Sequence, residues 1–301
     1  MLSAIAFCAW ITFTASSSAE LGQKLDQKHP IGKGNPPGKV VVADLAKKVE
    51  AVEAENESPR SLKKKDVITE NHTVFSGEAS KATLVFSNGS TINVLEKSKL
   101  VISELIQDPF STPFAMANAT EEPTTSTTKL NLKNGEVVCK VKKLRLEKGS
   151  SFTVDTPVGA AGVRGTTFAI SYLPNQNGTD TGTFTLSVTE GEVSFTDNEG
   201  NVSVVPAGKE VVISFRTAMD PVTGESTVVE IISRRVQDIP ADRLAMIERV
   251  ATEGDVDAET VVFDAPEMDL MQIFQFTDQQ LPPVNPKPVT DANPPANGAP
   301  N

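Results

Sequence analysis

The feature that most constrains the fold is a long series of short segments in which apolar residues recur at every second position. The alternation is renewed many times between residues 82 and 215, for example at Phe152 and Val154 and again at Phe184 and Leu186. Glycine-containing turns punctuate the series, at 134–135, 190–191, 199–200, 207–208 and 223–224. Period-two alternation between closely spaced turns is typical of β-strands. We therefore predict an all-β fold, as a sandwich, a barrel or an irregular solenoid, with antiparallel or solenoid-type strands.

Charge divides the chain into a nearly neutral body and an acidic end. The whole chain of 301 residues carries a net charge of -11, and residues 237–301 hold 12 acidic against 3 basic side chains. We expect a β domain over 39–236, an acidic extension over 237–280 and a Pro-rich disordered tail over 281–301. Pro240 and the apolar spacing that follows it predict a short helix from Pro240 to Val250. A net acidic chain also argues against nucleic acid as a partner.

The amino-terminal residues have the pattern of a secretory signal peptide. Leu2 to Phe13 is apolar, and residues with small side chains follow up to Ala19. No Lys or Arg precedes the apolar run. The apolar run is shorter than the roughly 20 residues that span a bilayer, so cleavage after residue 19 is favoured over an anchor. We therefore expect an exported protein, periplasmic or at the cell surface, without a membrane span and with a flexible lead-in over 20–38.

Three segments within the body allow more specific predictions. Residues 40–55 have the composition of an amphipathic helix, which competes with the strand interpretation. The Ser, Thr, Ala and Pro-rich residues 108–128 predict an exposed loop insertion between strands. Cys139 alternates with polar neighbours, which predicts a buried thiol on a strand.

The inventory of reactive side chains argues against catalysis. Two cysteines exclude the usual four-ligand zinc site, and His29 and His72 lie in a polar lead-in and beside a turn, where solvated side chains are expected. Carboxylates that converge in the fold remain an alternative, with Glu78, Asp155, Glu190 and Glu192 as the candidates. We expect no enzymatic activity, no cofactor and no metal.

Ordered motifs between residues 40 and 216 resemble the FecR domain family. They occupy 62–68, 77–90, 130–137 and 153–159, followed by Val163-Arg164-Gly165-Thr166-Thr167-Phe168, which is similar to the family's most specific signature, and by the turns in 188–193 and 206–209. The resemblance implies a bacterial, extracytoplasmic, non-catalytic β module, with residues 40–52 mainly strand. The best-known members relay a signal to a cytoplasmic sigma factor. Since this sequence contains no anti-sigma segment and no internal membrane helix, we expect a stand-alone module.

The motif residues are expected to be mainly structural. They are Thr156, Pro157, Gly159, Val163, Arg164, Gly165, Thr166, Phe168, Glu190 and Gly191. Pro157 is expected to end a strand, and the glycines to permit turns or close approaches. For Arg164 the favoured interpretation is a brace that holds loop carbonyls or pairs with Asp155 or Glu190. The alternative is a binding role, in which Arg164→Ala would leave stability nearly unchanged.

Concentrated positive charge occurs in two places. Lys63, Lys64 and Lys65 form one run, and Lys140, Lys142, Lys143 and Arg145 form the other. A solvated face is the favoured interpretation, with a site for an anionic polymer as the alternative. The leading functional hypothesis is contact with unidentified envelope proteins, as a sensor or scaffold. The alternatives are a protein that binds or processes cell-surface polysaccharide or peptidoglycan, and a structural surface protein.

Overall fold

The computed structural model describes residues 37–265 except 54–57, 175–179 and 220–225. These described residues belong to one compact unit that extends to Ala265. The predicted signal peptide, the lead-in up to residue 36 and the Pro-rich tail lie outside the described residues.

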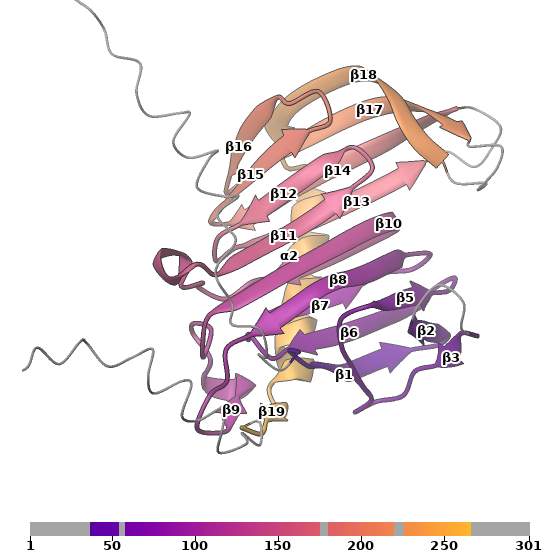
Figure 1. Cartoon of the computed structure of the whole chain (residues 1–301). Coiled ribbons are helices and arrows are strands. Elements are labelled where there is room, and N and C mark those ends of the chain that lie inside the picture. The colour runs from indigo at the N-terminus through magenta and orange to yellow at the C-terminus, as the bar shows by residue number, and fades with distance from the viewer. Residues whose placement is uncertain (1–36, 54–57, 175–179, 220–225, 266–301) are drawn as a thin grey trace, which may run out of the picture. The chain divides into compact units, whose positions relative to one another are not determined.

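Most of the unit consists of strands that form two layers, which we call sheets A and B (Figure 1). The strands of sheet A, in spatial order, are β3 (Arg60–Ser61), β2 (Val49–Glu53), β5 (His72–Ser76), β8 (Lys99–Gln107), β10 (Ser126–Lys140), β11 (Ser151–Thr156), β12 (Gly159–Val163), β15 (Glu192–Asp197) and β16 (Val202–Pro206). Those of sheet B are β4 (Val67–Ile68), β1 (Val40–Ala46), β6 (Lys81–Phe86), β7 (Thr91–Val94), the same β10, β13 (Thr167–Pro174), β14 (Thr181–Glu190), β17 (Lys209–Met219) and β18 (Ser226–Asp238).

Strand β10 joins the two sheets because its halves belong to different layers. Its first half, up to Asn134, pairs with β8 and, in parallel, with β11. Its second half, from Gly135, pairs antiparallel with β7 and β13. Gly135 has φ +92°, and a Cβ there would lie 2.5 Å from Ser98 Cα, so glycine is needed where the strand passes from one layer to the other.

The core lies between the sheets, where the alternating apolar side chains of both layers meet in one cluster. Phe184 of sheet B stacks on Phe195 of sheet A with ring centroids 4.7 Å apart, and Tyr172 stacks on Phe215 at 5.1 Å. Cys139 is part of this core, as its position in the alternation predicts. Burial raises the pKa of its thiol well above the ordinary value.

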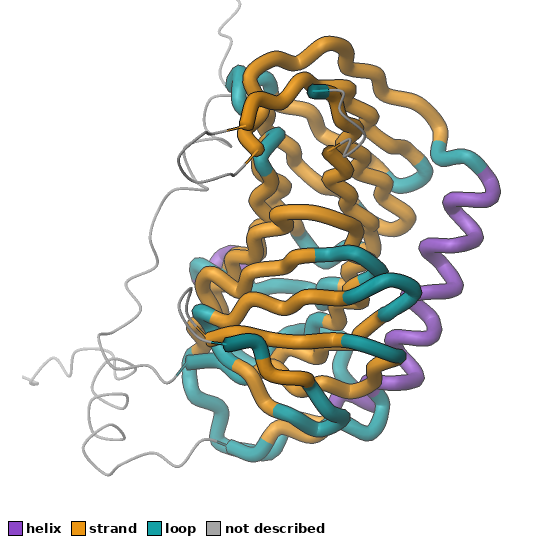
Figure 2. The backbone as a smooth tube through the Cα atoms, turned by 90° about the vertical axis from the view of Figure 1, so that its right-hand side faces the viewer, coloured by secondary structure: helices purple, strands orange, loops and turns teal. Residues whose placement is uncertain are grey.

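One long helix, α2 (Ala241–Ala258), packs on the outer face of sheet B, as Figures 1 and 2 show from two directions. Ile247, Ala251, Gly254 and Ala258 are its buried residues and recur at helical spacing. Two of them, Ile247 and Ala251, pack against Val138 and Ala169 of the sheet. Among the described residues, no helix combines the length and the apolar character that crossing a bilayer requires.

The carboxyl end of the helix packs against a short third sheet. Strand β9 (Phe114–Ala115) pairs with β19 (Val262–Phe263), and the 3-10 turn η1 (Met116–Asn118) follows β9. Together with Val85 and Ala258 these elements form a small second core. A further 3-10 turn, η2 (Leu146–Lys148), follows β10.

The all-β prediction is confirmed, and the paired strands are antiparallel except for β10 with β11. Two facing sheets fit the sandwich alternative, and no solenoid is confirmed. Residues 40–46 and 49–53 are strands, so the helix suggested by their composition is wrong. The exposed loop expected over 108–128 is wrong in part, because Met116, Glu122 and Ser126 are buried. The helix predicted to end at Val250 continues to Ala258.

Candidate contact surface at the Val163–Phe168 turn

Three turns meet at one end of sheet B, where β10 and β14 end and β13 begins. A Cβ on Gly165 would lie 3.3 Å from Lys143 Cα, so the turn after β12 lies directly against the segment that follows β10. A Cβ on Gly191 would lie 2.9 Å from the Gly165 carbonyl oxygen. Both glycines have positive φ, +60° and +76°, which a side chain disfavours. Glycine at these two positions therefore lets the three turns stack.

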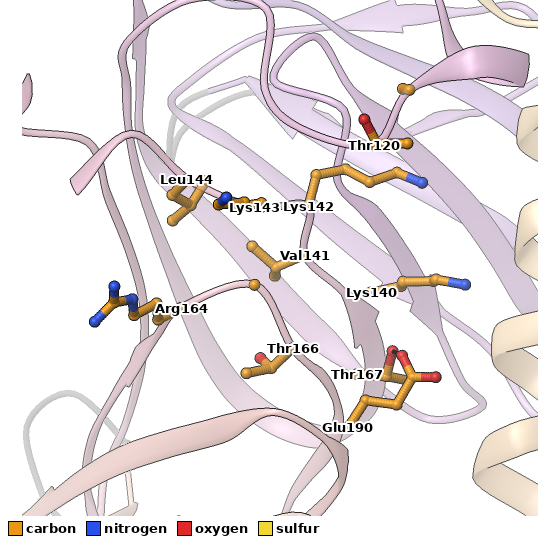
Figure 3. Close-up of a pocket in the computed structure, with 12 residues that line it drawn as sticks. Thr120, Lys140, Val141, Lys142, Lys143, Leu144, Arg164, Thr166, Thr167 and Glu190 are labelled. Atoms are coloured by element: carbon orange, nitrogen blue, oxygen red, sulfur yellow. Dashed lines mark hydrogen bonds between the residues drawn. The ribbon is translucent and has the colours of Figure 1, made fainter. Parts of the chain in front are cut away.

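The stacked turns enclose a shallow depression of about 490 Å³, shown in Figure 3. Residues 119–120, 140–144 and 164–167 line it, together with Glu190. Val141 and Thr166 lie at its centre, Lys140 and Lys142 extend to one side, and the Arg164 side chain points to the other. Four cationic side chains thus surround a floor that contains the buried Val141 and Leu144. We call Lys142, Lys143 and Arg164, with this floor, the cationic surface.

The four cations differ in how far the fold neutralises them. Lys140 donates to Asp255 of α2 at 2.6 Å. Within the described part of the chain, the structure gives the side chains of Lys142, Lys143 and Arg164 no hydrogen-bond or ion-pair partner. Burial lowers the pKa of Lys142, which Lys140 lowers further and Asp255 partly restores. Among the described residues, the surface therefore keeps three positive charges without a direct ion-pair partner, in a chain whose net charge is negative.

Two threonines of the turn have different surroundings. Thr167 donates its hydroxyl to Glu190 Oε2 at 2.8 Å. Thr166 is 2% exposed and lines the depression, and its Oγ1 has no hydrogen-bond partner among the described residues. A buried hydroxyl without a partner costs about 1–3 kcal/mol. An acceptor that enters the depression and reaches Thr166 would remove that cost.

A buried carboxylate holds the segment that carries Lys142 and Lys143. Glu122 is 0% exposed and accepts hydrogen bonds from Ser126 Oγ at 2.7 Å, from the Arg145 backbone N–H at 2.6 Å and from Ser150 Oγ. Its own N–H donates to the Lys143 carbonyl at 3.1 Å. Burial raises the pKa of this carboxyl group, and the three hydrogen bonds oppose that effect. Glu122 is thus a positioning residue for the cationic surface.

The described part of the chain does not show the brace expected for Arg164. Its side chain is exposed, Asp155 pairs with Lys129 at 3.0 Å, and Glu190 accepts from Thr167. The expectation that Asp155 or Glu190 holds this guanidinium is therefore wrong. The turn puts the arginine at the rim of the depression, and neighbouring glycines and backbone contacts hold the turn without it.

Most other residues of the motif contribute to packing or to turns. Val163 and Phe168 are buried in the core. Thr156 ends β11 before Pro157, and its hydroxyl accepts from the Val158 N–H and donates to the Gly159 carbonyl. A Cβ on Gly159 would lie 2.3 Å from the Thr196 carbonyl oxygen, so only glycine fits between β12 and β15.

The remaining candidates lie elsewhere in the fold. Lys63, Lys64 and Lys65 are exposed between β3 and β4, and Lys64 pairs with Asp44 at 2.8 Å. His72 is 6% exposed on β5, so the solvated side chain expected beside the turn is wrong. Of the four carboxylates considered for catalysis, only Glu190 lines the depression, while Glu78 pairs with Lys97.

Residues 72–194, which include the motifs and the turn that carries Arg164, match the family described as FecR protein. This part of the chain is therefore similar to FecR domains. Two solved structures of a protein from Parabacteroides distasonis ATCC 8503, provisionally named an anti-sigma factor, are similar at 10% identity and a TM-score of 0.38. The similarity covers 69% of this chain and 90% or 92% of theirs. No curated protein sequence matches significantly.

Two features of the surface do not follow from the sequence. The sequence shows Lys140, Lys142 and Lys143 as a basic run, but it does not show that this run lies beside Arg164. Their proximity depends on the pairing of β10 with β13. Glu122 falls within residues 108–128, whose composition predicts an exposed loop. Its only signal was an acidic side chain between Ser and Thr residues that can donate hydrogen bonds to it.

Proposed function

We propose that this chain is an exported, non-catalytic FecR module that acts as a sensor or scaffold by contacting other proteins of the bacterial envelope through its cationic surface. The observation that carries the proposal is the exposed Arg164 in the Val163–Phe168 turn. The turn is held by Gly165, Gly191 and the buried Val163 and Phe168, and the fold gives the arginine no partner among the described residues. Arginine is enriched at protein interfaces, where its planar group forms several directed hydrogen bonds.

A glycan-binding module is the less favoured alternative. Sites that bind sugars present aromatic rings as stacking platforms. The residues that line the depression include Lys, Arg, Thr and Val but no aromatic side chain. The test therefore identifies bound proteins and bound glycans together.

The experiment compares affinity capture from envelope extract by the tagged full-length chain and by its Arg164→Ala variant. We expect one or more envelope proteins to bind the unchanged chain and to be lost with Arg164→Ala, while the free energy of unfolding changes by less than about 0.5 kcal/mol. The matched control is Arg249→Ala, because Arg249 is exposed on α2 away from the depression. Captured glycan without protein, or capture that survives Arg164→Ala, would contradict the proposal.

A further inference from the structure

We infer that the cationic surface recognises an extended acidic polypeptide segment, whose side-chain carboxylates pair with Lys142, Lys143 and Arg164. The inference rests on the proposed function and names the chemistry of its partner.

The charges of the depression define the first requirement for a ligand. Lys140 is already paired with Asp255, whereas Lys142, Lys143 and Arg164 have no hydrogen-bond or ion-pair partner among the described residues. Asp255 acts on Lys142 only through its charge, without a direct contact. Lys142 is half-buried, and a partly desolvated ammonium group without a direct ion-pair partner gains more from a bound anion than an exposed one does. A carboxylate beside it would also restore the pKa that burial lowers.

The arrangement of these groups requires a ligand that is extended. Arg164 points to one side of the depression and Lys142 to the other, with Val141 and Thr166 between them (Figure 3). A ligand that is to contact both side chains therefore has to cross the depression. A chain that crosses the depression places carboxylates at both ends and covers the buried Val141 and the unpartnered Thr166 hydroxyl in the middle.

The presence of Glu190 favours a peptide over a phosphate polymer or a nucleic acid. Glu190 lines the same depression, and a ligand with continuous negative charge is repelled by it. A carboxylate accepts more hydrogen bonds than the one from Thr167, so Glu190 offers an acceptor to a peptide N–H. The lining also lacks the aromatic rings on which bases and sugars stack.

The test measures binding of the full-length chain to defined probes by fluorescence anisotropy. The main probe is a labelled, capped peptide of sequence Glu-Val-Glu-Thr-Glu-Val-Glu, and the comparison probes are its lysine counterpart, inorganic polyphosphate and vesicles of anionic phospholipid. We expect the acidic peptide to bind and its affinity to fall at least about tenfold in the triple variant Lys142→Gln, Lys143→Gln, Arg164→Gln. The matched control is Lys63→Gln, Lys64→Gln, Lys65→Gln, which removes the same net charge elsewhere and is expected to leave the affinity nearly unchanged.

Each other outcome overturns the inference. Equal losses in the two triple variants would mean that net charge alone attracts the peptide. Tighter binding of polyphosphate or of the vesicles, lost with the first triple variant only, would assign the surface to a polyanion or to a lipid headgroup. If the acidic peptide does not bind while envelope capture still depends on Arg164, the inference fails and the proposed function stands. If capture does not depend on Arg164, the proposed function fails.

Discussion

At the scale of single residues, burial separates Glu122 from the other acidic side chains near the cationic surface. Its carboxylate is fully buried and is held by two hydroxyls and one backbone N–H. Burial raises its pKa above the ordinary value of 4.5. Between the unfolded and folded pKa values the native state binds more protons than the unfolded chain, so the stability that this group contributes falls as the pH rises.

We therefore expect Glu122→Gln to remove part of the pH dependence of stability. Relative to the unchanged protein, the free energy of unfolding of Glu122→Gln should rise as the pH is raised from about 4.5 to about 8. Glu122→Ala leaves three donors without an acceptor and should cost about 3 kcal/mol. Urea unfolding of both variants across this pH range gives the measurement. A Glu122→Gln variant whose relative stability falls with rising pH would show that the carboxylate is preferentially charged in the fold.

Arg164 and the glycines mark what could be predicted for single residues. The requirement for glycine at 159, 165 and 191 follows from turn patterns in the sequence and is confirmed by the close approaches. The burial predicted for Arg164 from its apolar and small sequence neighbours is wrong, because its side chain is exposed. Those neighbours turn inward on strands β12 and β13, while the turn between them directs the arginine to solvent.

At the scale of elements, helix α2 owes its position on sheet B to a combination of ion pairs and small residues. Arg243 donates to Ser187 Oγ at 2.7 Å and lies 2.9 Å from Glu136 Oε1, and Lys81 pairs with Glu253 at 2.8 Å. Near its carboxyl end, Gly254 lies against Asn93 of β7. A Cβ on Gly254 would lie 2.5 Å from Asn93 Nδ2. The absence of a side chain here allows the helix to lie close to the sheet.

We predict that Gly254→Ala destabilises the protein, although alanine favours a helix by about 1 kcal/mol over glycine. The added methyl group displaces either the helix or the Asn93 side chain, whose Oδ1 accepts from Thr83 at 3.0 Å. The double variant Gly254→Ala, Asn93→Ala should lose less stability than the sum of the single variants, because the clashing atoms are removed. Thermal unfolding of the four proteins tests the coupling. Additive losses, or a Gly254→Ala variant more stable than the unchanged protein, would show that the close approach of Gly254 to Asn93 does not hold the helix in place.

Gly254 also explains why the sequence predicts a shorter helix than the structure has. Pro240 and the apolar spacing up to Val250 identify its start, but Gly254 and the acidic residues around it weaken the pattern toward its end. Contacts with sheet B, which no local pattern contains, carry the helix on to Ala258. Residues 40–55 present the opposite case. Their composition, rich in Ala, Lys and Glu, favours helix, but pairing with β6 makes residues 40–46 strand β1.

At the scale of the described unit, the alternation predicted the strands but not how they associate. The parallel pairing of β10 with β11 and the division of β10 between two sheets depend on contacts between residues distant in sequence. The cationic surface results from that arrangement. Lys142 and Lys143 follow β10 and Arg164 precedes β13, and pairing of these two strands brings them together.

The measurement that tests the central claim most directly is site-specific photocrosslinking of the full-length chain in cells of its source organism. A photoreactive residue replaces Arg164 in one protein and Lys63, exposed between β3 and β4, in the other. We predict a crosslinked adduct with a distinct envelope protein from position 164 and none from position 63. The same adducts from both positions, or no protein adduct from position 164, would contradict the claim that this turn is a protein-contact surface.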